Sequence, residues 1–212
     1  MSEAFAGKFI TLEGGEGAGK STQIARLGDW LRQRGREVIA TREPGGSAGA
    51  EMVRKLLVEG PSERWDGPTE AMLHFAARRD HLRVTVWPAL QRGAWVVSDR
   101  FADSTTAYQG YGHGVDRGLL NRLYSIAVGD FAPDLTVLLD LPVEAGLARA
   151  AARRGAETRY EGMPVEFHRR VRAGFLEIAA ANAARCVVLD ARQPIDAVAD
   201  AIAHAARDRL GA

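Results

Sequence analysis

One glycine-rich segment near the start of the chain constrains the fold more than any other feature. Residues 14–21 read Gly-Gly-Glu-Gly-Ala-Gly-Lys-Ser and match the pattern Gly-x-x-x-x-Gly-Lys-Ser/Thr. The pattern is typical of a phosphate-binding loop, in which backbone N–H groups surround phosphates, the lysine reaches the β- and γ-phosphates, and the hydroxyl binds Mg²⁺. An apolar run precedes the loop at residues 9–12, and Ile24, Leu27 and Leu31 follow it with helical spacing. A strand, a phosphate loop and a helix therefore open the chain.

The loop predicts where the phosphates of a nucleoside triphosphate bind. The candidate nucleotide-binding residues are Gly14, Gly15, Glu16, Gly17, Ala18, Gly19, Lys20 and Ser21. Of these, Lys20 supplies the positive charge and Ser21 the metal-binding hydroxyl.

Five apolar, β-branched runs alternate with segments of helical periodicity. The runs cover residues 8–13, 37–41, 95–98, 135–140 and 186–189. Helices are expected over residues 21–34, 50–59, 69–92, 117–128, 143–153, 165–184 and 195–209. Strands that alternate with helices form a parallel sheet covered on both faces. We therefore predict an α/β P-loop nucleoside triphosphate hydrolase fold, with a five-stranded parallel sheet that binds ligands at the carboxyl ends of its strands.

Length, charge and composition limit the other classes of function. The 212 residues are 46% hydrophobic, enough to fill one core, so we expect a single domain over residues 1–212. Lys and Arg total 28 against 27 Asp and Glu, and a net charge of +1 argues against a broad nucleic-acid-binding or membrane surface. No apolar run approaches the roughly 20 residues of a membrane span, and no targeting pattern opens the chain. We expect a cytoplasmic protein, with Cys186 as a buried thiol.

Polar residues at the ends of the expected strands indicate the reaction class. Arg42 follows the second strand, where an arginine can bind a phosphate through two parallel hydrogen bonds. Asp99 and Arg100 follow the third strand, where the carboxylate can hold Mg²⁺ through water or orient an attacking oxygen, and the arginine can bind a second phosphate. Two arginine positions besides the loop indicate transfer of a phosphoryl group between two phosphorylated ligands.

Arginines also cluster where a helical pattern breaks at Gly155. They are Arg149, Arg153, Arg154 and Arg159. Mobile arginines can neutralise the charge that develops during phosphoryl transfer while they exclude water. We expect a short lid over residues 149–161, the alternative being a solvated, positively charged helix face.

Taken together, these motifs resemble those of bacterial thymidylate kinases over nearly the whole chain. The matching segments are the loop and residues 9–14, 41–46, 69–71, 98–104, 107–110 and 159–161. The most specific are Arg42-Glu43-Pro44-Gly45-Gly46 and Ser98-Asp99-Arg100-Phe101. The resemblance implies a homodimer that uses ATP and Mg²⁺ to convert dTMP to dTDP. The residues expected to bind the metal remain Ser21 and Asp99, from the loop motif and the strand end.

The resemblance also assigns residues to the phosphate and sugar of dTMP. Arg42 and Arg100 would bind the 5′-phosphate. Glu16, inside the loop, would approach the 3′-hydroxyl, and Tyr108 would lie beneath the sugar, where its ring disfavours a 2′-hydroxyl.

For the base, the resemblance implies that Arg78 donates a hydrogen bond to a thymine carbonyl while Thr105 and Gln109 line the pocket. The family position that stacks on thymine corresponds to His74, and Phe75 is its neighbour. Successive helix residues point about 100° apart, so one of the two is expected to face the base and the other to pack in the core.

Catalysis is expected to depend on the lid, because the loop offers only Lys20 as a cation. The best candidates for contact with the transition state are Arg153 and Arg154. Arg149 would rest on adenine and Arg159 on phosphate. The predicted catalytic set is Lys20, Asp99, Arg100, Arg153 and Arg154.

Two other functions remain open at this stage. Another nucleoside or nucleoside monophosphate kinase would share the fold and differ only in the base pocket. A regulatory module would bind ATP and transfer nothing. A switch GTPase is not expected, because neither Asn121-Arg122 nor Asn182-Ala183 fits a guanine-reading Asn-Lys-x-Asp segment.

Overall fold

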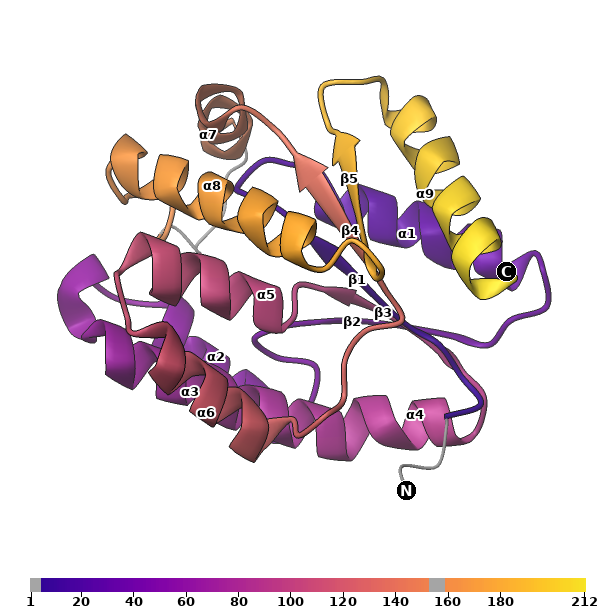
Figure 1. Ribbon diagram of the computed structural model, residues 1–212, viewed down its shortest axis with the longest axis horizontal. Helices are drawn as coiled ribbons and strands as arrows, with labels where there is room; N and C mark the ends of the chain where they lie inside the picture. Colours follow the sequence, from indigo (N-terminus) through magenta and orange to yellow (C-terminus); the bar gives the residue numbers. More distant parts are fainter. Residues whose placement is uncertain (1–4, 153–158) are drawn as a thin grey trace.

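Five parallel strands form the centre of the computed structural model, which describes residues 5–152 and 159–212 (Figure 1). The strands are β1 (Phe9–Glu13), β2 (Val38–Arg42), β3 (Trp95–Asp99), β4 (Leu135–Asp140) and β5 (Cys186–Asp190). Their order in the sheet is β2-β3-β1-β4-β5. All five predicted strands are confirmed, with ends that differ by no more than one residue, and so is the predicted α/β fold.

Helices cover both faces of this sheet (Figure 1). The first face carries α1 (Lys20–Arg32) and α9 (Ile195–Leu210). The second face carries α3 (Gly67–His81), α4 (Trp87–Gln91), α6 (Arg117–Ala127) and α8 (Val165–Ala181). Outside these, α2 (Ala48–Val58) packs on α3, and α7 (Val143–Ala151) packs on α8.

The three central strands, β1, β3 and β4, are buried on both faces, which explains why they read as continuous hydrophobic runs, whereas the edge strands β2 and β5 are partly exposed. In β1, Ile10 and Leu12 pack into the cluster with α1 and α9. Phe9 points the opposite way and packs edge-on against Phe101, with ring centroids 5.1 Å apart. The alternation of side chains along the central strand therefore builds two cores.

Two helical regions differ from the sequence predictions. The single helix predicted over residues 69–92 is interrupted by a π-helical turn, Leu82–Val86, just before Pro88, whose missing N–H cannot continue the regular pattern. A helix that was not predicted comprises α5 (Ala102–Thr105) and a π-helical continuation, Thr106–Gly112. Its many Ser, Thr and Gly residues are poor helix formers, so packing against α8 rather than local propensity stabilises it.

The strand register brings the site residues to one edge of the sheet. Asp99 pairs with Leu12 of β1 and with Arg42 of β2. The carboxyl ends of β1, β2 and β3 therefore meet beside the loop that follows β1, and this is the edge at which parallel sheets bind ligands. In the part of the chain described here, no helix combines the length and apolarity needed to cross a membrane.

Candidate functional site

The glycine-rich loop is held against two neighbouring elements. Gly14 has a φ of 139°, and a Cβ there would lie 2.5 Å from the carbonyl oxygen of Leu139 on β4. Gly17 has a φ of 69°, and its Cβ would overlap the carbonyl of Gly146 on α7. Only glycine fits the positive φ and the close approach at both positions. The loop backbone is therefore fixed by β4 and α7 independently of a ligand.

Lys20 begins α1 and is buried beneath the loop. Its Nζ donates to the carbonyl oxygens of Gly14 and Gly15, at 3.1 Å each. Burial, together with the positive charge of Arg100, lowers the pKa of the Lys20 ammonium group. The loop thus keeps a cation at its centre, where phosphate oxygens can replace the two carbonyls.

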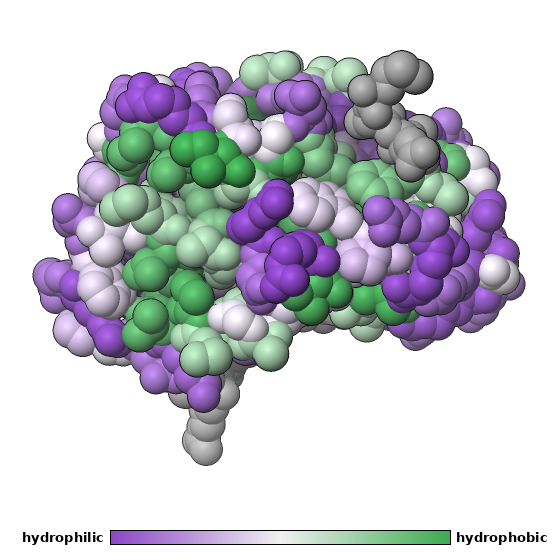
Figure 2. Space-filling view, turned by 90° about the horizontal axis from the view of Figure 1, so that it is seen from below, coloured by the Kyte–Doolittle hydropathy of each residue, from purple (hydrophilic) through white to green (hydrophobic). Residues whose placement is uncertain are grey.

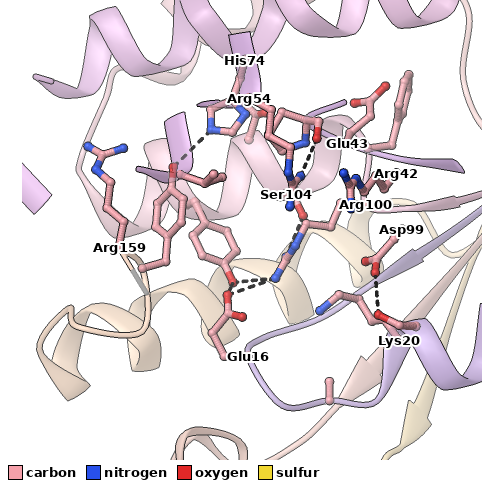
Figure 3. A pocket seen from close by; sticks show the side chains of 18 of the residues that line it. Glu16, Lys20, Arg42, Glu43, Arg54, His74, Asp99, Arg100, Ser104 and Arg159 are labelled. Atoms are coloured by element: carbon pink, nitrogen blue, oxygen red, sulfur yellow. Dashed lines mark hydrogen bonds and ion pairs between the residues drawn. The ribbon is translucent and has the colours of Figure 1, made fainter. Parts of the chain in front are cut away.

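A cavity of about 610 Å³ opens between the loop and α3, a size typical of small-molecule sites (Figure 3). In Figure 3, Glu16 and Lys20 lie on one side, His74 lies on the other, and Arg100 lies between them. The predicted site residues that line this cavity are Glu16, Gly17, Ala18, Gly19, Lys20, Ser21, Arg42, His74, Arg78, Asp99, Arg100, Thr105, Tyr108, Gln109 and Arg159. The structure brings the predicted donor and acceptor residues together around one space.

Gly14 and Gly15 belong to the same loop but do not line this cavity, and the remaining predicted residues lie elsewhere. Phe75 does not line the cavity and packs edge-on against Tyr124, so it is the member of the His74–Phe75 pair that packs in the core. Arg149 lies away from the cavity and donates to the carbonyl oxygen of Ala191 at 3.2 Å. Arg153 and Arg154 lie outside the described residues.

Ser21 and Asp99 meet at the floor of the cavity. The Ser21 hydroxyl donates to Asp99 Oδ2 at 3.2 Å, and Asp99 Oδ1 is buried with no partner. These are hard oxygen ligands of the kind that Mg²⁺ takes together with phosphate oxygens. Among residues 5–152 and 159–212, no three His, Cys, Asp or Glu side chains gather as an all-protein metal site. The pair fits a metal whose remaining ligands come from nucleotide and water.

Arg100 has a strained backbone, with a φ of 71°. A left-handed conformation costs a residue with a side chain about 1–3 kcal/mol. Two bonds maintain it, since the Ser98 hydroxyl donates to the Arg100 carbonyl at 2.8 Å and the Phe101 amide donates to Glu13 Oε1 at 2.7 Å. Burial, with Asp103 nearby, raises the pKa of the Glu13 carboxyl to about 8. The strained turn directs the Arg100 guanidinium toward the loop.

That guanidinium is the centre of a polar cluster. Nη1 donates to the Gly14 carbonyl and to the Ser104 hydroxyl, both at 3.0 Å. Nη2 donates to Glu16 Oε1 and to the Tyr108 hydroxyl, both at 3.1 Å. Figure 3 shows the side chains of Arg100 and Glu16 pointing toward each other across the cavity wall. Arg100 therefore links the loop to the helix at Ala102–Gly112.

Glu16 carries a negative charge in this cluster. Burial alone would raise its pKa, but the charges of Arg100 and Lys20 outweigh burial and lower the pKa of Glu16 to about 2. The Tyr108 hydroxyl donates to Glu16 Oε1 at 2.7 Å, and burial raises the pKa of that tyrosine well above its ordinary value. A charged acceptor from the loop and a neutral donor from the helix at Ala102–Gly112 thus lie beside each other in the cavity.

Arg42 is more exposed than Arg100 and is held by a carboxylate of α2. Its Nη2 lies 3.2 Å from Glu51 Oε2, and about half of its side chain is exposed. Glu51 also accepts from the Gly46 amide at 3.0 Å, which lowers the pKa of Glu51. Since exposed ion pairs are weak, Arg42 can exchange Glu51 for a ligand phosphate at little cost.

Arg78 projects from α3 into the cavity wall and is only 2% exposed. Its Nε donates to Glu43 Oε2 at 2.7 Å, and its Nη2 donates to the Thr105 hydroxyl at 3.1 Å. Nη1 is buried without a hydrogen-bond partner. A buried N–H donor is rarely left unpaired, so Nη1 is the group of this wall that a ligand oxygen would satisfy.

Three side chains meet at the hydroxyl of Tyr160. It donates to Glu70 Oε1 at 2.5 Å, so its single proton is used there. Nε2 of His74 and Nε2 of Gln109 lie 3.2 Å and 3.3 Å from the same oxygen and act as donors to it. Burial, assisted by the charge of Arg78, lowers the pKa of His74 to about 3. The ring of His74 is therefore neutral and has its orientation fixed.

Arg159 is fixed by α2 and α3. Nη1 donates to Glu70 Oε1 at 2.6 Å and to the Leu57 carbonyl at 2.8 Å, while Nε donates to the Pro61 carbonyl at 3.3 Å. Arg159 also lines the cavity, and its expected contact with phosphate stays a prediction. This arginine anchors the chain after residues 153–158 to the base side of the cavity.

The sequence interpretation missed the carboxylates that hold these cations. Glu43 lies within the Arg42-Glu43-Pro44-Gly45-Gly46 motif, and Glu70 lies within residues 69–71, yet neither received a role. Glu70 stands directly before the apolar residues Ala71, Met72 and Leu73, and a lone acidic residue beside such a run is a usable sign of a buried pair. Glu43 lies between Arg42 and Pro44 and has no such sign. The sequence could not show which cation each one meets.

Nearly the whole length of the chain is similar to known thymidylate kinases. The family model for thymidylate kinase matches residues 12–202. Thymidylate kinase from Caulobacter vibrioides is 54% identical over 205 residues, which cover 97% of this chain and 98% of that protein. Thymidylate kinase from Bradyrhizobium diazoefficiens is 50% identical over 206 residues, covering 96% of this chain and 90% of that protein.

The fold is also similar to that of a solved thymidylate kinase structure. The crystal structure of thymidylate kinase from Ehrlichia chaffeensis superposes with a TM-score of 0.71 at 36% identity. The match covers 86% of this chain and 92% of that one.

Proposed function

The chain belongs to the thymidylate kinase family and phosphorylates dTMP to dTDP, and we propose that it takes the phosphoryl group from ATP with the help of Mg²⁺. An oxygen of the dTMP 5′-phosphate attacks the γ-phosphorus of ATP, the bond from that phosphorus to the β-phosphate oxygen breaks, and ADP leaves. The chemistry is mainly positioning and charge neutralisation. The residues around the cavity supply both.

The donor side of this proposal is the loop at residues 14–21. Its backbone N–H groups and Lys20 would bind the β- and γ-phosphates of ATP. Ser21 and Asp99 would hold Mg²⁺, which neutralises charge on the bridging phosphate oxygens when bound. The unpartnered Asp99 Oδ1 supports this assignment, because it leaves an acceptor unused beside the Ser21 hydroxyl.

The acceptor phosphate would lie between Arg42 and Arg100. Both line the cavity next to the loop, and Arg42 has only an exposed partner to exchange. Glu16, which keeps its charge, would accept from the 3′-hydroxyl of the sugar. Tyr108, which donates to Glu16, would lie beneath the same sugar.

The base would lie against α3. Arg78 Nη1 would donate to a thymine carbonyl, the neutral ring of His74 would stack on the base, and Thr105 and Gln109 would line the pocket. One observation carries the proposal most directly: Arg78 holds a buried, unpartnered donor in the wall of the same cavity as the phosphate loop. A site that only bound ATP would have no need of this second polar wall.

Substrate choice tests the function. A coupled assay of ADP release should give the highest kcat/KM with dTMP in a panel that also contains dUMP, dCMP, dGMP and AMP. If AMP, dCMP or dGMP outperformed dTMP, another nucleoside monophosphate kinase would be the better description. Saturable ATP binding without ADP production in the presence of dTMP would instead indicate a regulatory module.

We extend the proposal to the lid and the catalytic arginines. Arg153 or Arg154 would neutralise charge in the transition state, because the loop carries Glu16-Gly17-Ala18 and only Lys20 as a cation. Arg149 would contact adenine after releasing the Ala191 carbonyl. The double variant Arg153→Ala/Arg154→Ala should lower kcat more than dTMP affinity, and equal activity would refute a catalytic lid.

We also propose a single domain that forms a homodimer in the cytoplasm. Large apolar side chains are exposed on three helices that lie side by side: Met52 and Leu56 of α2, Met72 of α3 and Ile126 of α6. Figure 2 shows hydrophobic side chains gathered on this face. An exposed apolar surface of this kind is typical of a protein interface, and a second copy of the chain would cover it.

A further inference from the structure

We infer that Glu43 and His81 are positioning residues that fix the guanidinium of Arg78 and thereby set which pyrimidine the acceptor pocket takes. The inference rests on the proposed function, in which Nη1 of Arg78 donates to a carbonyl of the base. Glu43 lines the cavity, but its two carboxylate oxygens are bonded to Arg78 and His81, and His81 is fully buried. Both act through Arg78.

The guanidinium of Arg78 is held at two of its three nitrogens. Nε donates to Glu43 Oε2 at 2.7 Å, and Nη2 donates to the Thr105 hydroxyl at 3.1 Å. Because the group is planar and rigid, fixing Nε and Nη2 also fixes the direction of Nη1. That third nitrogen has no partner and is buried in the cavity wall.

Glu43 is in turn held by His81. Its carboxylate is 3% exposed, and Oε1 lies 2.9 Å from His81 Nδ1. A carboxylate accepts hydrogen bonds, so Nδ1 carries the hydrogen. On the other side of the ring, Nε2 lies 2.7 Å from the Thr41 hydroxyl, which donates to it when the ring is neutral. Thr41, His81, Glu43 and Arg78 therefore form one buried chain of hydrogen bonds, which we call the Arg78 relay.

Packing leaves the relay little freedom to rearrange. The Arg78 guanidinium carbon lies 4.9 Å from the ring centre of Phe75 and 5.1 Å from that of Phe101. At the far end, Gly46 has a φ of 83°, and a Cβ there would lie 2.5 Å from His81 Nε2. The relay is thus enclosed by aromatic rings at one end and by backbone at the other. It spans β2, the loop after it and α3.

The direction of Nη1 matters for the choice of base. A pyrimidine with a carbonyl at ring position 4 accepts a hydrogen bond from Nη1. A cytosine presents an amino group at the same position, so two donors would face each other without an acceptor. A site built around one hydrogen bond rejects an analogue that cannot make it far better than an apolar pocket does. A guanidinium free to turn away would lose that rejection.

Two substitutions of His81 separate the Nδ1 contact from the rest of the side chain. The amide nitrogen of Asn can occupy the place of Nδ1 and keep the donor to Glu43, whereas that of Gln reaches toward the place of Nε2. We expect His81→Gln to lower the ratio of kcat/KM for dTMP to that for dCMP by about tenfold or more. The loss should come mainly from a higher KM for dTMP. His81→Asn should keep the ratio within about threefold of the wild-type value.

Glu43→Gln provides a second variant with the same shape. Its amide group can satisfy only one of the two donors that face Glu43, so the same ratio should fall. The matched control for lost stability is Ile202→Ala, which shortens a core side chain of α9 on the other face of the sheet. It should lower the melting temperature and leave the ratio unchanged.

The outcomes separate the inference from the function on which it rests. If the wild-type protein does not prefer dTMP over dCMP, the proposed function fails. If the wild type prefers dTMP while folded Glu43→Gln and His81→Gln proteins keep the ratio, the inference is overturned, even if kcat falls. An equal fall in His81→Asn and His81→Gln would also overturn it, because the Nδ1 contact would then play no part.

Discussion

At the scale of single residues, the site is a set of buried charges whose partners determine what each can do. Glu16 stays ionised because Arg100 and Lys20 outweigh the effect of its burial. His74 stays neutral because burial and Arg78 oppose its protonation. The two residues lie on opposite sides of one cavity (Figure 3). A negatively charged hydrogen-bond acceptor therefore lies across the cavity from a flat, neutral ring.

The first prediction concerns the effect of Lys20 on turnover. Lys20→Ala should reduce turnover by about 10³-fold or more, because the cation at the centre of the loop disappears. The fold should persist, since the loop backbone is held by β4 and α7. Turnover and thermal melting of Lys20→Ala and of the surface control Lys8→Ala would check this. Normal turnover with a cooperative melt would exclude the role of Lys20.

The lowered pKa of His74 gives a pH dependence. Between its ordinary value of 6.5 and about 3, the folded protein binds fewer protons at His74 than the unfolded chain does. The contribution of the neutral His74 ring to the free energy of unfolding is therefore complete above pH 6.5, and it is lost as the pH falls. Relative to His74→Gln, the wild type should lose stability from pH 6.5 to 4 by less than about 1.4 kcal/mol per pH unit, since the cavity admits solvent.

Urea unfolding of both proteins across this pH range would measure the difference. Glu13 has a raised pKa, so its own contribution to the free energy of unfolding falls as the pH rises. Both proteins contain Glu13, so this effect cancels in the difference between them. Parallel stability profiles for wild type and His74→Gln would show that the histidine is not held neutral.

At the scale of elements, α3 carries the base side of the site on one of its faces. Glu70, His74, Arg78 and His81 recur at intervals of three or four residues and therefore lie along one side of the helix. Ala71 and Phe75 pack on the core side. This spacing was visible in the sequence, but the apolar pattern of α3 is weak because four functional polar residues occupy it.

Substitution of Glu70 tests how much α3 contributes to stability through its bonds to Arg159 and Tyr160. Glu70→Ala would leave Arg159 buried with only its other partners and would remove the acceptor of the Tyr160 hydroxyl. We expect a loss of about 3–5 kcal/mol in the free energy of unfolding, as is typical when one partner of a buried pair is removed. Urea unfolding would measure it.

The exposed pair between Arg117 and Glu177 is the control, since both side chains are more than half exposed. Glu177→Ala should change the stability by no more than about 0.5 kcal/mol. Equal effects of the two substitutions would show that Glu70 is no more important than a surface carboxylate.

At the scale of the whole molecule, the sheet order places the loop on the central strand, with β3 on one side and β4 on the other. The strands and the loop were predictable because burial on both faces and the spacing of glycines leave local marks in the sequence. Contacts such as Glu43 with His81, or Glu70 with Tyr160, join residues 38 and 90 positions apart. Such pairings arise only when the elements pack, and for the same reason the helix at Ala102–Gly112 was missed.

The apolar face of α2, α3 and α6 gives the expectation for assembly. Ile126 is 80% exposed and Met52 is 73% exposed, so Ile126→Lys/Met52→Lys should convert the proposed dimer into a monomer without unfolding it. Light scattering after gel filtration would measure the mass. Ile195→Lys, on α9, is the control and should remain a dimer. A wild-type monomer, or a double variant that stays dimeric, would contradict the proposed interface.

The most direct test is a crystal structure with dTMP, Mg²⁺ and a non-hydrolysable ATP analogue bound together. We expect the triphosphate on the loop at residues 14–21, and the dTMP phosphate between Arg42 and Arg100. A thymine carbonyl should lie within hydrogen-bonding distance of Arg78 Nη1, which has no protein hydrogen-bond partner. A base bound away from α3, with Arg78 Nη1 still unpaired, would contradict the account.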